Sequence, residues 1–285
     1  IGWCDWSSDV CSSDLASLFE KNRNVQVGVF LTTHLHLAAL KARGIDANLS
    51  LGLSLGEYNH LVHIGALDFT AALRLVDARG MVYDEGPRGM MAALFPVDRE
   101  MADETLEKAR PKGRVEIANL NSPSQFVIAG EYAAVEEAMR IADEEYSVSP
   151  APIERQIPMH TSVFRPASEA LAPHLKAAPW KQPSLPYVSN VLGGFVDSPK
   201  PSDFIELLTR HVYSPVRWQA SIDAIAEKYP DAVFIEVGPR SVLYNLLQKR
   251  WRNNKKFKTD AADKHTEHFR SLVETLSSPL ASSAE

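Results

Sequence analysis

The chain has almost no cysteine. Its two cysteines, Cys4 and Cys11, both lie within residues 1–15, so the rest of the protein has none. That absence excludes a mechanism in which a thiol of the protein body is the nucleophile. A metal or disulfide role for the two cysteines themselves is a weak alternative, because no other ligand residues stand near them in the sequence.

An excess of positive charge is also missing. The formal net charge is -6 and the isoelectric point is about 5.9, so we expect no general attraction to nucleic acid or to anionic membranes. The longest apolar stretch, residues 25–40, is interrupted by glutamine, threonine and histidine and is too polar to span a bilayer. No charged segment followed by an apolar core and a cleavage site is recognisable, so we expect a cytoplasmic protein.

The first residues, 1–15, read IGWCDWSSDVCSSDL and show neither helical nor strand periodicity. This string is similar to translated sequencing-adaptor DNA. We therefore expect residues 1–15 to be non-native, and the true N-terminal part of the protein to be missing.

Helical and strand patterns alternate in the next part of the chain. Apolar residues recur at helical spacing over 25–43, a short apolar run over 46–53 predicts a buried strand, and a helix is expected through Ile64. Asp68 can cap a further amphipathic helix that runs to Gly86. This order is typical of the α/β class.

Residues 88–158 follow a different order. Their pattern predicts strand, helix, two strands, helix and strand, which is the ferredoxin-like unit. Because the flanking segments are α/β in character, we expect this unit to be an insertion in a core made of residues 16–87 and 159–254. The tail, residues 255–285, is polar and is expected to be loosely attached.

The stretch GLSLG, residues 52–56, places Ser54 in a G-x-S-x-G frame between a predicted strand and a predicted helix. Such a frame is typical of a nucleophile elbow, where a tight turn lifts the serine hydroxyl clear of the sheet. Small flanking residues are expected because bulkier ones would collide in the turn. A plain turn serine between two glycines is the alternative.

Several ordered segments are similar to one known family. GLSLGEYNHLVHIGALDFTAALRLVDARG resembles the nucleophile region of the malonyl-CoA:acyl-carrier-protein transacylases and the related polyketide acyltransferase domains. NLNSPSQFVIAG, PMHTSVFRPA, SNVLGG, SPVRW and IEVGPRSVL resemble further segments of that family, in the same order. The resemblance covers roughly residues 20–252. It implies an α/β-hydrolase-like core with a parallel sheet and the inserted ferredoxin-like subdomain.

The resemblance also implies the roles of the reacting groups. Ser54 corresponds to the nucleophile, and the N–H of Leu55 to half of the oxyanion hole. His160 corresponds to the base that activates the serine and then protonates the leaving thiolate. A main-chain carbonyl before SPVRW orients that histidine in the family, and here His211 stands where glutamine is usual. If only the backbone matters, this change need not impair the site.

The resemblance implies that two further residues, Arg79 and Met159, select the acyl group. Arg79 corresponds to the family arginine whose planar fork binds the free carboxylate of a malonyl group. A solvated helix arginine is the alternative. Met159, just before the catalytic histidine, occupies a position where the family varies between bulky and small residues. Its bulk favours malonyl over methylmalonyl.

Two departures from the family stand out. Leu53 replaces the histidine that usually precedes the nucleophile, which we interpret as a tuning difference. The family's glutamine loop of the G-Q-G-S-Q kind, which completes the oxyanion hole, is absent from the sequence. We therefore expect half of the hole and one central strand to be missing.

The other histidines offer an alternative site. His60 and His63 form an H-x-x-H pair that could bind a metal. No third ligand stands nearby in the sequence, so a helix face with polar positions is the favoured interpretation, and no metal is expected.

The implied function is transfer of a malonyl group from malonyl-CoA to the phosphopantetheine thiol of an acyl carrier protein, in fatty acid or polyketide synthesis. No bound cofactor, nucleic acid or membrane partner is expected, and the protein is expected to be a monomer. An acyl-carrier-protein acyl hydrolase and a non-catalytic scaffold that docks the carrier protein are the alternatives. The acidic helices of the insertion disfavour RNA binding.

Overall fold

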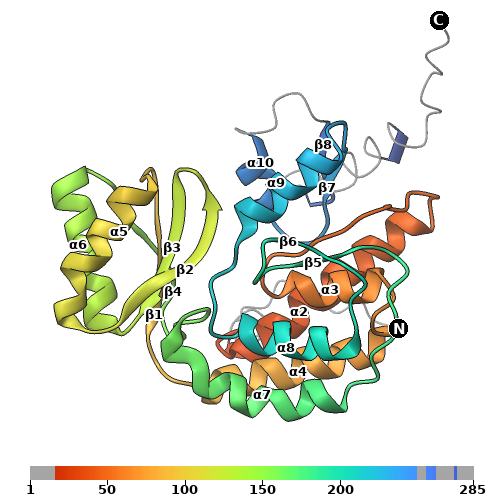
Figure 1. The fold of residues 1–285 in the computed structure, drawn as a ribbon, viewed down its shortest axis with the longest axis horizontal. Coiled ribbons are helices and arrows are strands. Elements are labelled where there is room, and N and C mark those ends of the chain that lie inside the picture. Colours follow the sequence, from red (N-terminus) through yellow and green to blue (C-terminus); the bar gives the residue numbers. More distant parts are fainter. Residues whose placement is uncertain (1–16, 249–254, 261–272, 275–285) are drawn as a thin grey trace, which may run out of the picture.

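The computed structural model describes residues 17–248, 255–260 and 273–274 of the chain. A helix-rich core and a smaller sheet with two helices lie side by side (Figure 1). The prediction for residues 1–15 lies outside the described residues, as does most of the predicted tail. None of the helices in the described part combines the length and the apolar character that crossing a bilayer requires.

Helices make up most of the core. They are α2 (Asn22–Lys41), α3 (Gly56–His63), α4 (Phe69–Glu85), α7 (Arg165–Ala177), α8 (Pro201–His211), α9 (Trp218–Lys228) and α10 (Val242–Gln248). Four short strands accompany them: β5 (Tyr187–Ser189), β6 (Gly194–Val196), β7 (Phe234–Glu236) and β8 (Lys256–Lys258). A single apolar cluster joins α2, α3, α4, α7 and α8, and fully buried aromatic rings such as Phe30, Phe164 and Phe204 belong to it.

Side-chain caps fix the helices that carry the site. The Asp68 carboxylate accepts the N–H of Ala71 at 2.8 Å, so α4 begins where the sequence predicts. The carboxylate of Asp84, near the end of α4, accepts the first two N–H groups of α2, those of Asn22 and Arg23, at 2.8 and 3.0 Å. Since these N–H groups have no partner within their own helix, Asp84 both satisfies them and ties α2 to α4.

The smaller part follows the predicted order of elements. Its elements are β1 (Met90–Leu94), α5 (Arg99–Ala109), the 3₁₀ turn η1 (Arg110–Lys112), β2 (Val115–Ser122), β3 (Gln125–Gly130), α6 (Tyr132–Tyr146) and β4 (Ala151–Glu154). The strands form one sheet in the order β2-β3-β1-β4, with every neighbouring pair antiparallel. Side chains alternate between the faces of a strand. Met90, Ala92 and Leu94 of β1 accordingly pack in the cluster with α5 and α6, whereas Met91 packs on the other face with Met159.

Contacts with two core segments, at Ser162 and at Val216, fasten this sheet to the core. The Glu116 carboxylate of β2 accepts the N–H of Ser162, in the 3₁₀ turn η2 (Ser162–Phe164), at 2.8 Å. The N–H of Val216, just before α9, donates to the carbonyl of Ala118 at 2.8 Å, and the Val216 carbonyl accepts from Leu120 at 2.9 Å. The insertion is therefore anchored close to the candidate base.

The prediction of a strand over residues 46–53 is wrong. No residue of that segment belongs to a strand. Among the described residues, parallel pairing is confined to β7 with β8 and to one isolated bridge, between Asn119 of the smaller sheet and Val216 of the core. An apolar run becomes a strand only when a neighbour supplies its hydrogen bonds. The described part of the chain offers residues 46–53 no such neighbour.

The expectation of a loosely attached chain from residue 255 onward is also wrong for β8. Lys256–Lys258 pairs in parallel register with Phe234–Glu236. The Thr259 hydroxyl lies 2.8 Å from Nδ1 of His36 and accepts the N–H of Gly238 at 3.1 Å. These contacts attach the segment to α2 and to the loop after β7.

Candidate active site

Ser54 lies on a strained turn that leads directly into α3. Its φ is 50°, a left-handed value that is costly for a residue with a side chain. A Cβ on Gly52 would come within 2.0 Å of the Gly56 backbone, so only glycine fits there. A Cβ on Gly56 would meet nothing within 4 Å. The steric need for a small residue therefore applies to the first glycine of the motif and not to the second.

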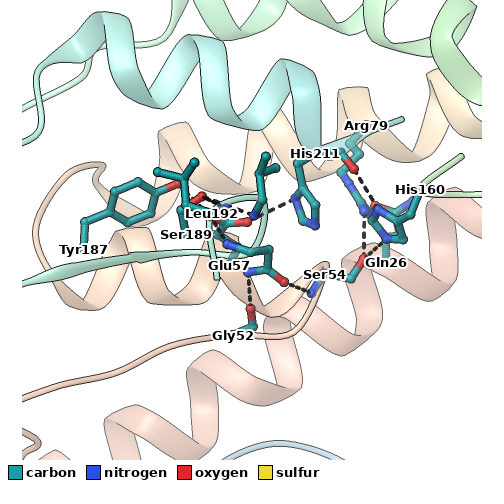
Figure 2. Close-up of polar contacts among 12 residues, drawn as sticks. Gln26, Gly52, Ser54, Glu57, Arg79, His160, Tyr187, Ser189, Leu192 and His211 are labelled. Carbon is teal, nitrogen blue, oxygen red and sulfur yellow. Dashed lines mark hydrogen bonds and ion pairs between the residues drawn. The ribbon is translucent and has the colours of Figure 1, made fainter. Parts of the chain in front are cut away.

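Asn190 clamps this turn from the loop that follows β5. Its Oδ1 accepts the N–H of Ser54 at 2.9 Å, and its Nδ2 donates to the carbonyl of Gly52 at 2.6 Å. Figure 2 labels Gly52 and Ser54, the two residues of the turn whose backbone groups these bonds hold. Two hydrogen bonds from one buried amide hold both sides of the strained turn, which offsets part of the cost of the positive φ. The sequence analysis quoted this segment as SNVLGG without giving Asn190 a role.

His160 faces the serine. Its Nε2 lies 2.7 Å from Ser54 Oγ, and its Nδ1 lies 2.7 Å from the main-chain oxygen of His211, at the end of α8. A carbonyl can only accept, so Nδ1 carries the proton and Nε2 presents its lone pair to the hydroxyl. The N–H of His160 also donates to the carbonyl of Val212 at 3.0 Å.

The charge state of His160 suits a base. The ring is 2% exposed, and burial lowers its pKa to about 3, with a further lowering by the positive charge of Arg79. The bond to the His211 carbonyl opposes this shift. The imidazole is therefore neutral at physiological pH and free to accept the serine proton.

Arg79 completes the group from α4, as Figure 2 shows. Its side chain is 2% exposed, one guanidinium nitrogen donates to Ser54 Oγ at 3.1 Å, and the other donates to the side-chain oxygen of Gln26 on α2. The guanidinium carbon lies 4.2 Å from the centre of the Tyr83 ring. Within the described part of the chain, no carboxylate comes within ion-pair distance of Arg79. A buried cation without an acid is costly, so this geometry suits an anionic ligand beside the serine.

Leu55 and Met159 flank the pair. Leu55 stands at the N-cap of α3, and no acceptor in the described residues takes its N–H. That amide is thus available to a ligand at the positive end of the helix. Met159 is half-buried between the core cluster and the sheet cluster of the insertion, next to His160.

His60 and His63 lie apart from this group. Their Nδ1 atoms are 2.7 and 2.9 Å from the same hydroxyl, that of Ser50, and the His60 Nε2 accepts the N–H of Val188 at 3.1 Å. Burial, followed by the charge of His63, lowers the pKa of His60 to about 3. The two rings therefore share a serine in a hydrogen-bond chain. Across the described ranges, no three or more His, Cys, Asp or Glu side chains are grouped to hold a metal ion.

A strained serine turn and a neutral histidine that faces it, within an α/β fold, are typical of proteins that transfer acyl groups through a serine. The sequence pattern described as the acyl transferase domain matches residues 4–268, so the chain belongs to that family. Within it, the chain is a member of the malonyl CoA-acyl carrier protein transacylases. It is 36% identical to the Bacillus subtilis protein of that name over 84% of this chain and 74% of the relative.

Further similar proteins and solved structures carry the same family name. The Haemophilus influenzae malonyl CoA-acyl carrier protein transacylase is 34% identical over 70% of this chain and 64% of its own length. The solved structure of the Streptococcus pneumoniae transacylase superposes with a TM-score of 0.82 at 32% identity, covering 92% of this chain and 84% of that one. A malonyl-transacylase in complex with a type II polyketide acyl-carrier protein superposes with a TM-score of 0.80 at 28% identity, covering 91% and 83%.

Proposed function

We propose that this protein transfers a malonyl group from malonyl-CoA to the phosphopantetheine thiol of an acyl carrier protein. The observation that carries the proposal is the buried guanidinium of Arg79, 3.1 Å from Ser54 Oγ and without a carboxylate partner in the described residues. The names of the relatives support the same reaction, and one related structure holds a carrier protein. No bound cofactor is needed, because the thioester supplies the activated acyl group.

In the first half-reaction, Ser54 Oγ attacks the thioester carbonyl while Nε2 of His160 takes the hydroxyl proton. The carbonyl of His211 stabilises the imidazolium by keeping Nδ1–H hydrogen-bonded. The Leu55 N–H donates to the oxyanion. When the tetrahedral intermediate collapses, the C–S bond breaks and His160 returns its proton to the departing CoA thiolate. The malonyl group is then esterified to Ser54.

The second half-reaction reverses these roles. His160 takes the proton of the carrier protein's thiol, whose sulfur attacks the serine ester. The C–O bond breaks, and His160 returns the proton to Ser54 Oγ. Arg79 holds the malonyl carboxylate throughout, with Gln26 orienting its guanidinium from α2. Met159 borders the acyl group and favours the unbranched malonyl chain.

The finer fold assignment belongs to the same proposal. We assign residues 88–158 as a ferredoxin-like subdomain inserted between residues 16–87 and 159–254 of an α/β-hydrolase-like core. The element order and the strand order β2-β3-β1-β4 support the subdomain, and the serine turn before α3 supports the core. The monomeric state, the cytoplasmic location, and the absence of nucleic-acid and membrane partners stay predictions.

The Arg79→Ala variant tests the choice of acyl group. Malonyl-CoA and acetyl-CoA present the same thioester and differ by one carboxylate. Losing a desolvated guanidinium–carboxylate pair costs about 3 kcal/mol, so malonyl loading should fall on the order of 10²-fold. Acetyl loading should be kept or rise, because no unpaired cation remains buried. Acylation rates with both thioesters measure this.

Two further variants sharpen the comparison. Arg79→Lys should restore malonyl loading only in part, since an ammonium lacks the planar fork. Arg74→Ala removes an exposed arginine of the same helix and should change neither rate. Equal losses with malonyl-CoA and acetyl-CoA in Arg79→Ala would show that the residue is structural, and would overturn the dicarboxylate assignment.

A further inference from the structure

Two ionisable groups that the two half-reactions do not use lie directly beneath the serine turn. Glu57 on α3 is 1% exposed and His211 at the end of α8 is 2% exposed. Oε1 of Glu57 accepts the hydroxyl of Tyr187 at 2.6 Å and the N–H of Asn190 at 3.4 Å. Oε2 of Glu57 lies 3.1 Å from Nδ1 of His211, at ion-pair distance.

The His211 side chain connects this acid to the base. Its ring stacks on the His160 ring with centroids 4.8 Å apart and an angle of 23° between the planes. Its main-chain oxygen accepts the Nδ1–H of the same ring. Nε2 of His211 is buried and has no hydrogen-bond partner in the described part of the chain. Among the described residues, Glu57 is the acid that lies at ion-pair distance from this imidazole, as Figure 2 illustrates.

Burial shifts the ionisation of both members of the pair. Burial raises the pKa of Glu57 to about 7, against the lowering by the Tyr187 hydroxyl, the Asn190 amide and the charge of Arg79. Burial, with His160 and Arg79, holds the pKa of His211 well below its usual value. Glu57 is thus neutral below about pH 7 and becomes a carboxylate as the pH rises through that value.

The ionisable groups around Glu57 and His211 determine whether deprotonation of Glu57 favours or opposes an imidazolium nearby. They are Tyr187 from β5, Arg79 from α4, His160 before η2, and Tyr58, the neighbour of Glu57 on α3. Burial raises the pKa values of both tyrosines, so they stay neutral in this range. Deprotonation of Glu57 therefore adds one negative charge to a site whose fixed charge is the Arg79 cation. In a buried site such a charge favours an imidazolium nearby.

We propose that Glu57 and His211 form a positioning pair for His160, in which loss of the Glu57 proton makes the stacked His160 ring a stronger base toward Ser54. This proposal rests on the proposed malonyl transfer and adds its regulation by pH.

The test is the pH dependence of Ser54 acylation by malonyl-CoA, followed by rapid quench and intact mass from about pH 5.5 to about pH 9. In the wild type, the rate should rise through an ionisation at about 7. Glu57→Gln keeps an acceptor for Tyr187 but cannot ionise, so the rise should disappear and the rate above pH 8 should fall about tenfold. Tyr187→Phe removes a donor that stabilises the carboxylate, so the ionisation should move to higher pH.

Glu206→Gln is the matched control, because Glu206 is an exposed carboxylate on the same helix as His211 and forms an ion pair with Arg210. Its pH profile should equal that of the wild type. A Glu57→Gln enzyme with the wild-type profile, whatever its absolute rate, would overturn the positioning role. Should Glu57→Gln fail to fold, an unshifted ionisation in Tyr187→Phe would overturn it instead. Absence of acylation in the wild type at every pH would overturn the proposed transfer itself.

Discussion

Ser54→Ala should form no covalent malonyl enzyme. The hydroxyl is the only group placed both 2.7 Å from the neutral base nitrogen of His160 and 3.1 Å from the Arg79 guanidinium within the described residues. Alanine at this turn keeps the fold but offers no oxygen to acylate. Incubation with malonyl-CoA, followed by intact mass and peptide mapping, should therefore give one malonyl group on Ser54 in the wild type and none in the variant.

Ser50→Ala is the matched control for that experiment. Ser50 lies four positions upstream and also contacts two histidine rings, His60 and His63, but not His160. Its removal should leave the malonyl label on Ser54 unchanged. A label that maps to Ser50 or to any other residue of the wild type would end the assignment of Ser54 as nucleophile.

His160→Ala should slow acylation by roughly 10²–10⁴-fold, the usual cost of losing a general base. The neutral Nε2 is the group aligned to take the serine proton, since Nδ1 is bonded to the His211 carbonyl. Single-turnover acylation rates with malonyl-CoA measure the loss. The variant should still bind the substrate, because it retains the Arg79 guanidinium that we propose binds the acyl carboxylate.

His174→Ala controls for the loss of an imidazole in general. His174 is an exposed residue of α7, so its replacement should leave the acylation rate unchanged. If His160→Ala matched the wild-type rate, the base would have to be another group, with the buried His211 ring the first to consider.

The helices could be predicted from the sequence because their signals are local. The cap at Asp68, the apolar spacing of α2 and the order of elements in residues 88–158 depend on neighbours within a few positions. The strand expected over 46–53 could not be judged in the same way. Whether an apolar run forms a strand depends on a partner elsewhere in the chain.

The residues of the site also fall into those that a motif indicates and those that only long-range contacts reveal. Motifs named Ser54, His160 and Arg79 as candidate site residues, and the structure brings them into contact. Asn190 and Gln26 were missed, although each holds a key group in place. Their contacts join positions far apart in the sequence, so no spacing rule could reveal them.

The His211–Glu57 contact shows what such long-range contacts add. The sequence marked His211 as a departure from the usual glutamine, and implied a role for its backbone only. The motif GLSLGEY contains Glu57, but nothing in it indicates that the carboxylate turns inward toward α8 and β5. Only the packing of α3 against α8 and β5 shows that the site holds a buried acid, Glu57, close to the proposed base, His160.

The central claim is transfer of the malonyl group from Ser54 to a carrier-protein thiol, and a chase experiment tests it most directly. Wild-type protein is loaded with malonyl-CoA, freed of CoA, and mixed with a carrier protein that bears phosphopantetheine. Intact masses of both proteins are then followed in time. The account predicts that the malonyl group leaves Ser54 and arrives on the carrier protein in equal amounts. Release as free malonate would indicate a hydrolase, and failure to load at all would indicate a scaffold; either result would contradict the account.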